Sequence, residues 1–385
     1  MENQHLNVKT AGGWGALISS GKFLMREGFF KGSKTLFSLN QVKGFDCPGC
    51  AWPDPSDGER SITEFCENGV KAIAFETTKR RASKELFEEK TVSQLNEYDV
   101  YTITNQGRLT EPFYYNKQKD KYEPISWDSA FEIVAKHLKA LNNPDDAIFY
   151  TSGRTSNEAA FLYQLMGRML GTNNFPDCSN MCHESSGVGM GESVGIGKGT
   201  VSLEDFDKAE LIMIFGQNPG TNHPRMLSEL QKANKRGAKI ISINPLKESG
   251  LVSFTHPQDV GQMLTNKATP ISSHYYQVKM GSDMALIQAI IKYILENDEA
   301  SLDKDFINEH TAGFDEYKNE ILQKDWKSLV EETSLQEEEI IEIAKLYASS
   351  KKTICCWAMG LTQHQHGVAT IEEVMNLLLI KGNIG

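Results

Sequence analysis

The fold of this chain is decided by residues 211–227, which read LIMIFGQNPGTNHPRML. Residues 211–216 form an apolar run, which is typical of a strand that is buried on both faces. A loop rich in Gly, Asn and Pro follows, and the segment 224–237 has the pattern of an amphipathic helix that ends at Gly237. Strand, loop and helix in this order predict one βα unit.

The same alternation extends on both sides of this unit. Further strands are predicted at 147–151, 238–244, 275–281 and 353–360, and further helices at 126–141, 157–170, 283–297 and 371–382. Strands and helices that alternate at this spacing predict parallel βαβ connections. The expected fold is therefore α/β, with doubly wound, Rossmann-like domains built on a parallel sheet.

Residue types that bind ligands collect where the predicted strands end. Gly, Asn, Pro and His concentrate in the loops at 152–158, 216–224, 244–248, 281–283 and 360–367. Ligands of doubly wound sheets bind at the carboxyl ends of the strands, so these loops predict one ligand-binding edge. The chain contains neither GxGxxG nor GxxxxGK[ST], and so it lacks a plain NAD or ATP fingerprint.

The composition argues against several classes of protein. The 385 residues include 40 Lys and Arg against 51 Asp and Glu, a net charge of −11. This acidity disfavours a nucleic-acid partner, because no basic excess exists to neutralise phosphates. No apolar run reaches the ~18 residues of a membrane span, and the first residues carry no signal-peptide pattern. We therefore expect a cytoplasmic protein without a membrane span.

Seven cysteines are too few for a disulfide scaffold, but the first three are grouped. Cys47 and Cys50 are separated by two residues in a turn, and Cys66 follows. This spacing is typical of thiolates at a zinc or iron–sulfur site, and Asp54 could supply an oxygen as the fourth ligand. A thioredoxin-like pair or unconnected thiols are the alternatives.

The remaining cysteines form two further groups. Cys182 directly precedes His183 and follows Cys178 in a segment rich in small residues. Such surroundings lower the pKa of a thiol, so Cys182 is a candidate nucleophile or metal ligand, against the alternative of two buried structural cysteines. Cys355 and Cys356 are neighbours in a predicted strand and point to opposite faces, so they cannot bind one ion together.

Taken in order, these motifs resemble those of the molybdopterin oxidoreductase family, whose members bind bis-molybdopterin guanine dinucleotide. Within the family, the sequences of these motifs are most similar to those of the formate dehydrogenase-like branch. The series is CPGC, CENGVK, GRTSNE, DCSNMCHESSG, GQNPGTNHP, INPL, GSD, GLTQH and GNIG. It extends from about residue 10 to the last residue.

The resemblance implies a role for individual residues. Cys182 would ligate molybdenum, and His183 would assist proton movement. Lys71 matches the lysine that lies between cluster and pterin in the family. The pterin dinucleotide would be bound by Ser152, Arg154, Asn157, Gly216, Asn218, Asn222, His223, Pro224, Asn244, Gly281, Asp283, Gly360 and Gln363.

The iron–sulfur motif and the length of the chain depart from the family pattern. Asp54 stands where iron–sulfur members have a third cysteine, so a 4Fe–4S cluster would be bound by Cys47, Cys50 and Cys66 with one oxygen ligand; a degenerate site without a cluster is the alternative. Lys71 also lies further from Cys66 than the family pattern has it. The chain ends where relatives continue, so we expect it to be an N-terminal half. The C-terminal half would then be supplied by a separate chain or be missing.

The expected organisation is an N-terminal arm at 1–45, an iron–sulfur region at 46–110 and an α/β molybdopterin-binding core at 111–385. The expected function is a molybdenum-dependent oxidoreductase that acts on a small molecule, with formate first and nitrate or another oxyanion second. Electrons would pass through the cluster to an unidentified partner. The alternatives are an inactive fragment, a partner-binding scaffold, and a zinc-dependent or Cys/His hydrolase.

Overall fold

The centre of the structure is a four-stranded parallel sheet. The computed structural model describes residues 10–384 except 154, 177 and 266, and omits the side chains of 178–180. The strands pair in the order β10-β7-β6-β11, and every pair is parallel. Their bounds are β6 (Leu211–Phe215), β7 (Lys239–Ile243), β10 (His274–Tyr276) and β11 (Thr353–Trp357). The predicted α/β fold with a parallel sheet is confirmed.

The apolar run that predicted β6 is explained by burial on both faces of the sheet. Leu211, Met213 and Phe215 belong to one core cluster, whereas Ile212 and Ile214 belong to a second cluster. All five side chains are at most 1% exposed. Full burial of a side chain of this size contributes about 1.5–3 kcal/mol to folding, so an interrupted run here would weaken both layers.

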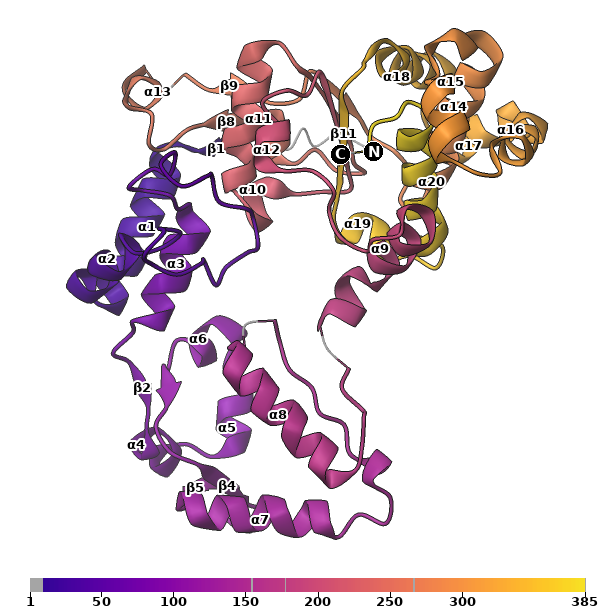
Figure 1. Cartoon of the computed structure of the whole chain (residues 1–385). Coiled ribbons are helices and arrows are strands. Elements are labelled where there is room, and N and C mark those ends of the chain that lie inside the picture. Colours follow the sequence, from indigo (N-terminus) through magenta and orange to yellow (C-terminus); the bar gives the residue numbers. More distant parts are fainter. Residues whose placement is uncertain (1–9, 154, 177, 266, 385) are drawn as a thin grey trace, which may run out of the picture. The chain divides into compact units, whose positions relative to one another are not determined.

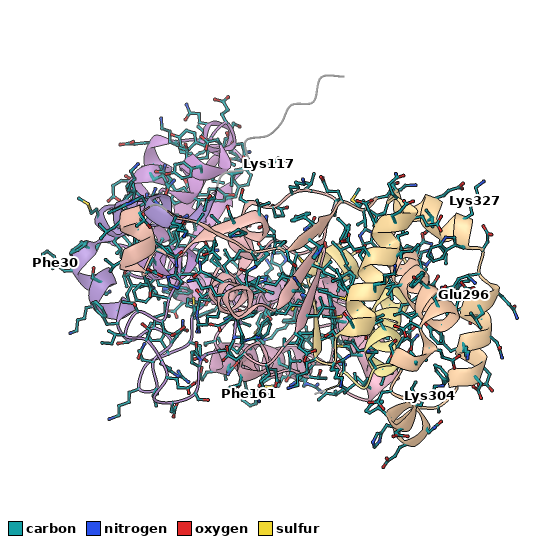
Figure 2. The ribbon with its side chains drawn as sticks, turned by 90° about the horizontal axis from the view of Figure 1, so that it is seen from above. Phe30, Lys117, Phe161, Glu296, Lys304 and Lys327 are labelled. Atoms are coloured by element: carbon teal, nitrogen blue, oxygen red, sulfur yellow. The ribbon has the colours of Figure 1, made fainter. Side chains whose placement is uncertain are left out.

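Helices cover both faces of the sheet. In Figure 1 the orange and yellow helices gather on one side of β11, and α11 lies on the other. Lys304 and Lys327 project from the outer surface of the first group (Figure 2). This first group consists of α14 (Asp283–Asn297), α15 (Lys304–His310), α16 (Phe314–Gln323), α17 (Trp326–Thr333), α18 (Glu337–Ser349) and α20 (Gly367–Leu379). No described helix has the length and apolar character that crossing a membrane requires.

The second face is covered by shorter elements around α11 (Arg225–Arg236). A small sheet of order β1-β8-β9 adjoins them. Its strand β8 pairs in parallel with β1 and antiparallel with β9. The bounds here are β1 (Ala11–Gly12), α10 (Pro219–Asn222), α12 (Ser249–Val252), β8 (Ser253–Thr255), α13 (Val260–Thr265), β9 (Thr269–Pro270) and α19 (Met359–Thr362).

The chain divides into two compact units. Unit 1 comprises Met1–Gly21, Phe37–Val70 and Met181–Gly385, and unit 2 comprises Lys22–Leu36 and Lys71–Asn180. The helices α1 (Gly13–Glu27), α3 (Glu67–Glu76) and α9 (Cys178–Val194) extend across the divisions. Unit 2 also contains α2 (Phe29–Leu36), β2 (Arg81–Ala82), α4 (Lys84–Glu89), α5 (Val92–Asn96), α6 (Val100–Thr104), β3 (Arg108–Leu109), β4 (Phe113–Asn116), β5 (Lys121–Pro124), α7 (Trp127–Lys139) and α8 (Asn157–Leu170).

Local signals set the ends of several helices. The Ser126 hydroxyl accepts a hydrogen bond from the Ser129 N–H at 3.1 Å and so caps α7 as predicted. Gly171 and Gly237 end α8 and α11 in the left-handed conformation, with φ of 104° and 98°. These ends were predictable because each depends on residues within one turn.

The predicted strand at 147–151 is wrong, because this segment forms no strand in the described structure. The Phe149 N–H donates to the Asn174 carbonyl at 2.9 Å. Its ring packs against Tyr163 and Phe175, with centroids 5.3 and 5.7 Å away. Phe149 is therefore buried by side chains of the same unit, whereas Ile148 and Tyr150 are 70% and 49% exposed, so the run is not a strand buried on both faces.

Cys355 and Cys356 lie on opposite faces of β11, as predicted. Cys355 packs against one core cluster and Cys356 against the other. Burial raises the pKa of both thiols, that of Cys356 to about 12. Both are therefore protonated structural residues at neutral pH.

Candidate cofactor and iron–sulfur site

The strand order creates a switch point at the carboxyl edge of the sheet. From β6, the strands β7 and β10 are added on one side and β11 on the other, and ligands of such sheets bind where this direction changes. Gly216 follows β6, and Gly360 follows β11. A Cβ on Gly360 would lie 2.4 Å from the Gly216 carbonyl oxygen, and Gly216 has a φ of +56°. The two predicted glycines therefore meet at the switch point and leave a surface of bare backbone.

Gln217 supplies a buried polar group at the same place. Its side chain is 7% exposed, and its Nε2 lies 3.1 Å from His223 Nε2 and 3.4 Å from the Trp357 carbonyl. The backbone carbonyl of Gln217 accepts a hydrogen bond from Asn244 Nδ2 at 2.9 Å. Gln217 Oε1 has no hydrogen-bond partner in the described part of the chain. A buried oxygen left in this state costs about 1–3 kcal/mol, so it is a candidate contact for a bound ligand.

Sequence reasoning did not single out Gln217, although it stands inside the motif that supplied its neighbours. The signal that could have found it is its position directly after Gly216, where a strand ends. Both polar atoms of the Asn244 side chain, which was predicted as a site residue, form hydrogen bonds within these loops. Its Nδ2 donates to the Gln217 backbone carbonyl, and its Oδ1 accepts from the Leu246 N–H at 3.3 Å.

The other predicted residues of this motif shape the loop that follows β6. Asn218 Oδ1 accepts from the Thr221 N–H at 3.2 Å and caps α10, while its Nδ2 donates to Glu248 at 2.6 Å. Asn222 ends α10, and Pro224 stands before the first residue of α11. In this structure, these residues therefore fix the conformation of the loop.

The loop after β11 holds the segment that carries Cys182. Thr362 Oγ1 donates to the Cys182 carbonyl at 2.7 Å, and Gln363 Nε2 donates to the Met181 carbonyl at 3.2 Å. Ser185 Oγ donates to the Thr362 carbonyl at 2.9 Å. Two segments that are far apart in the sequence, and that were both predicted as site residues, are thus brought together.

His183 lies at a kink in α9, where its φ of −133° departs from helical geometry. Its Nδ1 is 3.3 Å from Ser186 Oγ, which also accepts a hydrogen bond from Trp357 Nε1 at 2.9 Å. Burial lowers the pKa of the His183 imidazole. The ring is therefore neutral at neutral pH and has a fixed neighbour on one side.

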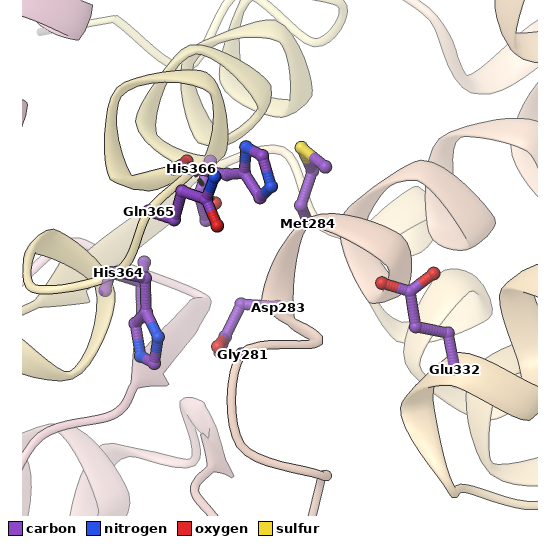
Figure 3. A pocket seen from close by; sticks show the side chains of 9 residues that line it. Gly281, Asp283, Met284, Glu332, His364, Gln365 and His366 are labelled. Atoms are coloured by element: carbon purple, nitrogen blue, oxygen red, sulfur yellow. Dashed lines mark hydrogen bonds between the residues drawn. The ribbon is translucent and has the colours of Figure 1, made fainter.

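A cavity of about 150 Å³ lies beside the start of α14. Figure 3 shows His364, His366 and Glu332 around Asp283. Asp283 is 7% exposed, and burial raises the pKa of its carboxyl group to about 6. Gly281 lies opposite the His364 ring, since a Cβ there would be 3.7 Å from His364 Nδ1. The predicted residues Gly281 and Asp283 thus line one cavity.

The three cysteines predicted to bind iron lie close to one another. Burial raises the pKa of the Cys47 and Cys66 thiols, and the charge of Cys50 raises both further. No three His, Cys, Asp or Glu side chains among the described residues are arranged around the position of a single metal ion. An iron–sulfur cluster distributes its thiolates over several irons and so needs a wider arrangement of donors.

Backbone amides stabilise the thiolate forms of these cysteines. The Gly49 N–H donates to Cys47 Sγ at 3.4 Å. The N–H groups of Asn68 and Gly69, in the first turn of α3, donate to the sulfur of Cys66. Hydrogen bonds of this kind lower the pKa of a thiol and are a means by which proteins tune cluster sulfurs. The donor set therefore fits an iron–sulfur cluster.

The cysteine loop is linked to the switch point through aromatic packing. Trp52 follows Cys50 closely, and its indole stacks on the His223 ring at 6.2 Å with an angle of 6°. Burial lowers the pKa of His223, so the ring is neutral beside Gln217. The predicted site residue His223 thus contacts both the cysteine loop and the end of β6.

Asp54 lies between two guanidinium groups. Its Oδ1 is 2.7 Å from Arg225 Nη1, and its Oδ2 is 3.4 Å from Arg60 Nη1. The role of Asp54 as an iron ligand stays a prediction.

Four predicted residues belong to the segment 71–180 and their roles stay predictions. The Lys71 ammonium lies 5.2 Å from the centroid of the Phe23 ring. Asn157 is the first residue of α8, and Ser152 precedes that helix in the loop. Arg154 lies outside the described residues.

Comparison with known proteins gives relatives over nearly the whole chain. The chain is 47% identical over 384 residues to protein YdeP of Escherichia coli strain K12, covering 97% of this chain and 50% of YdeP. It is 47% identical to the uncharacterized oxidoreductase Rv2900c of Mycobacterium tuberculosis, covering 98% and 49%. It is 33% identical to the F420-dependent formate dehydrogenase subunit alpha of Methanocaldococcus jannaschii, covering 75% and 39%. The chain thus spans about half the length of its most similar curated relatives.

A solved structure and a family model agree with these relatives. The acetylene hydratase of Pelobacter acetylenicus has the same fold over 69% of this chain and 34% of its own length, with a TM-score of 0.55 and 22% identity. The model of the family described as molybdopterin oxidoreductase matches residues 108–385. The resemblance of the motifs is confirmed, and the chain belongs to the molybdopterin oxidoreductase family.

Proposed function

We propose that this chain forms the iron–sulfur region and part of the cofactor-binding core of a molybdenum-dependent, formate dehydrogenase-like oxidoreductase. The observation that carries the proposal is the position of Cys182 and His183, which the loop after β11 holds at the carboxyl edge of the sheet. Similarity to a formate dehydrogenase subunit makes formate the first substrate to test. Nitrate or another oxyanion is the second.

The switch point fits a molybdopterin guanine dinucleotide. Bare backbone at Gly216 and Gly360 allows a phosphate or a ring to approach closely. Gln217 Oε1 is a buried acceptor that needs a donor, and Asp283 presents a second acceptor beside a cavity. The N–H groups of guanine and pterin edges are suitable donors for both oxygens.

The chain's own residues supply position and proton transfer. The cofactor, when bound, supplies two-electron redox chemistry at molybdenum. The Cys182 thiolate would hold the metal, since soft ligands suit it. In the tautomer whose Nδ1–H donates to Ser186 Oγ, the Nε2 atom of the neutral His183 ring would accept a proton from substrate.

The proposal includes a cytoplasmic location and a 4Fe–4S cluster that passes electrons to a separate partner. Cys47, Cys50 and Cys66 would bind the cluster. Polypeptide that corresponds to the remaining half of the relatives would complete the cofactor site, either in the same protein or as a second chain.

The first test is elemental analysis of the anaerobically purified protein for molybdenum, tungsten, iron and zinc, together with extraction of bound pterin. The variant Cys182→Ala should lose formate turnover and keep most of the bound pterin. Met181→Ala is the matched control, because this neighbouring side chain is 58% exposed and only its backbone carbonyl is used in the structure.

Each outcome of this test bears on the proposal. Molybdenum and iron in the wild-type protein, with activity lost in Cys182→Ala alone, would support it. Full turnover in Cys182→Ala would refute the role of this cysteine. Zinc without molybdenum or iron would favour the hydrolase alternative.

A further inference from the structure

The carboxylate of Asp54 forms ion pairs with two arginines. Its Oδ1 lies 2.7 Å from Arg225 Nη1 as a close ion pair without the geometry of a hydrogen bond, and its Oδ2 lies 3.4 Å from Arg60 Nη1. The side chain is 13% exposed. Pro53 and Pro55 flank it and restrict the backbone on either side. A shift of this carboxylate toward the cysteines would therefore need both ion pairs to break and a stiff segment to move.

The charge of Arg225 needs Asp54 as a counter-ion because the guanidinium group is buried. It is 8% exposed, and its guanidinium also donates to Glu64 Oε1 at 2.7 and 3.1 Å and to the Trp52 carbonyl at 3.4 Å. Burial lowers the pKa of Arg225, but the hydrogen bonds to Glu64 and the charges of Glu64 and Asp54 outweigh it and raise the pKa overall. A buried cation held in this way needs both carboxylates.

The same network fixes the cysteine loop. The Cys47 N–H donates to Asn40 Oδ1 at 2.8 Å, and Asn40 Nδ2 donates to the Glu64 carbonyl at 2.6 Å. The charge of Arg225 also lowers the pKa of the Cys47 thiol, against the larger effect of burial. Arg225 therefore contacts the loop through Trp52 and Asp54 and acts on its first cysteine electrostatically.

We propose that Asp54 is the counter-ion of Arg225 and that the cluster at this site is bound by three protein thiolates, from Cys47, Cys50 and Cys66. The proposal rests on the iron–sulfur cluster of the proposed function. Arg225 and Asp54 are positioning residues, and the fourth iron of a four-iron cluster has no ligand from these side chains. That iron is then bound by solvent or an added small ligand and is exchangeable.

An exchangeable iron has a defined chemistry. Ferricyanide removes one electron from a four-iron cluster, and the oxidised cluster then releases one Fe²⁺ ion and leaves a three-iron cluster. Added Fe²⁺ with one electron from dithionite reverses the change. A protein carboxylate bound to the fourth iron would slow this exchange, so its removal in Asp54→Asn would then speed the loss of iron.

The test uses the full chain, reconstituted anaerobically with iron and sulfide. Iron and sulfide are counted before and after ferricyanide, and the three-iron cluster is followed by electron paramagnetic resonance. The variants are Asp54→Asn and Asp54→Asn with Arg225→Gln. Asp57→Asn is the matched control, because Asp57 lies in the same segment, contacts Arg60 at 3.5 Å and is 71% exposed.

We expect the wild-type protein and all variants to lose one iron in four at the same rate on oxidation and to regain it with Fe²⁺. Asp54→Asn alone should lower the thermal midpoint of unfolding, and the double variant should recover part of the loss, which keeps the test informative if the single variant is unstable. A wild-type cluster that loses its iron more slowly than Asp54→Asn and the double variant do would overturn the assignment. A wild-type chain that takes up no iron and sulfide would overturn both the cluster and the assignment.

Discussion

Replacing the buried carboxyl group of Asp283 by an amide should stabilise the protein at alkaline pH. Asp283 is 7% exposed at the start of α14, and burial raises its pKa from about 4 to about 6. At ~1.4 kcal/mol per pH unit, this rise corresponds to about 3 kcal/mol of unfavourable free energy when the group is ionised. Asp283→Asn keeps the shape and removes the charge.

The sign of the effect follows from proton binding. Between about pH 4 and pH 6 the folded protein binds more protons at Asp283 than the unfolded chain does, so the wild type loses stability as the pH rises through this window. The gain from Asp283→Asn should therefore be near zero at pH 4 and reach about 2–3 kcal/mol above pH 7. Urea denaturation of both proteins at a series of pH values measures this difference directly.

A matched control separates this effect from a general effect of removing a carboxylate. Asp315→Asn changes an exposed carboxyl group in the first turn of α16 and should alter stability by less than about 0.5 kcal/mol at any pH. His364, His366 and Glu332 line the same cavity and are unchanged in both variants. A difference between Asp283→Asn and the wild type that is constant from pH 4 to pH 8 would refute the reasoning.

Substitutions at three further positions, one of them with a matched control, test other parts of the site. Gly360→Ala should destabilise the fold by about 1–3 kcal/mol, because its Cβ would lie 2.4 Å from the Gly216 carbonyl oxygen. The control Gly191→Ala in α9 places a Cβ that meets nothing within 4 Å and should stabilise the fold by about 0.5–1 kcal/mol. Urea denaturation measures both changes. His223→Gln should flatten the loss of stability below about pH 6.5, since burial lowers the pKa of His223 and folding then opposes its protonation. Arg225→Gln should make the potential of the proposed cluster more negative in a redox titration, because a buried cation would favour its reduced form.

Each of these variants has an outcome that contradicts its reason. Equal stability of Gly360→Ala and Gly191→Ala would mean that the two loops do not meet at the switch point. An unchanged acid limb in His223→Gln, in the same denaturation series, would show that His223 is free to protonate in the folded protein. A cluster potential that does not move in Arg225→Gln would remove the electrostatic role of this residue.

The helices at 126–141, 157–170, 224–237, 283–297 and 371–382 and the four strands of the central sheet could be predicted from the sequence because their signals are local. The helices α1 and α2, in the segment expected to be an arm, were not predicted. A strand buried on both faces needs a continuous apolar run, as at residues 211–215, and a helix needs a cap within one turn, as at Ser126 and Gly237. The segment 147–151 shows the limit of such reasoning. Only Phe149 of its apolar run is buried, and only tertiary contacts show that the neighbours Ile148 and Tyr150 are exposed.

The sequence by itself determined the α/β architecture, the order of the ligand-binding loops and the residue types that could bind iron and molybdenum. Only the tertiary structure decided which of these residues meet. Gly216 contacts Gly360 because the strand order places β6 beside β11, and Asp54 pairs with Arg225 because α11 packs near the cysteine loop. Both contacts join segments that are far apart in the chain, and no local pattern of hydrophobicity or capping specifies them.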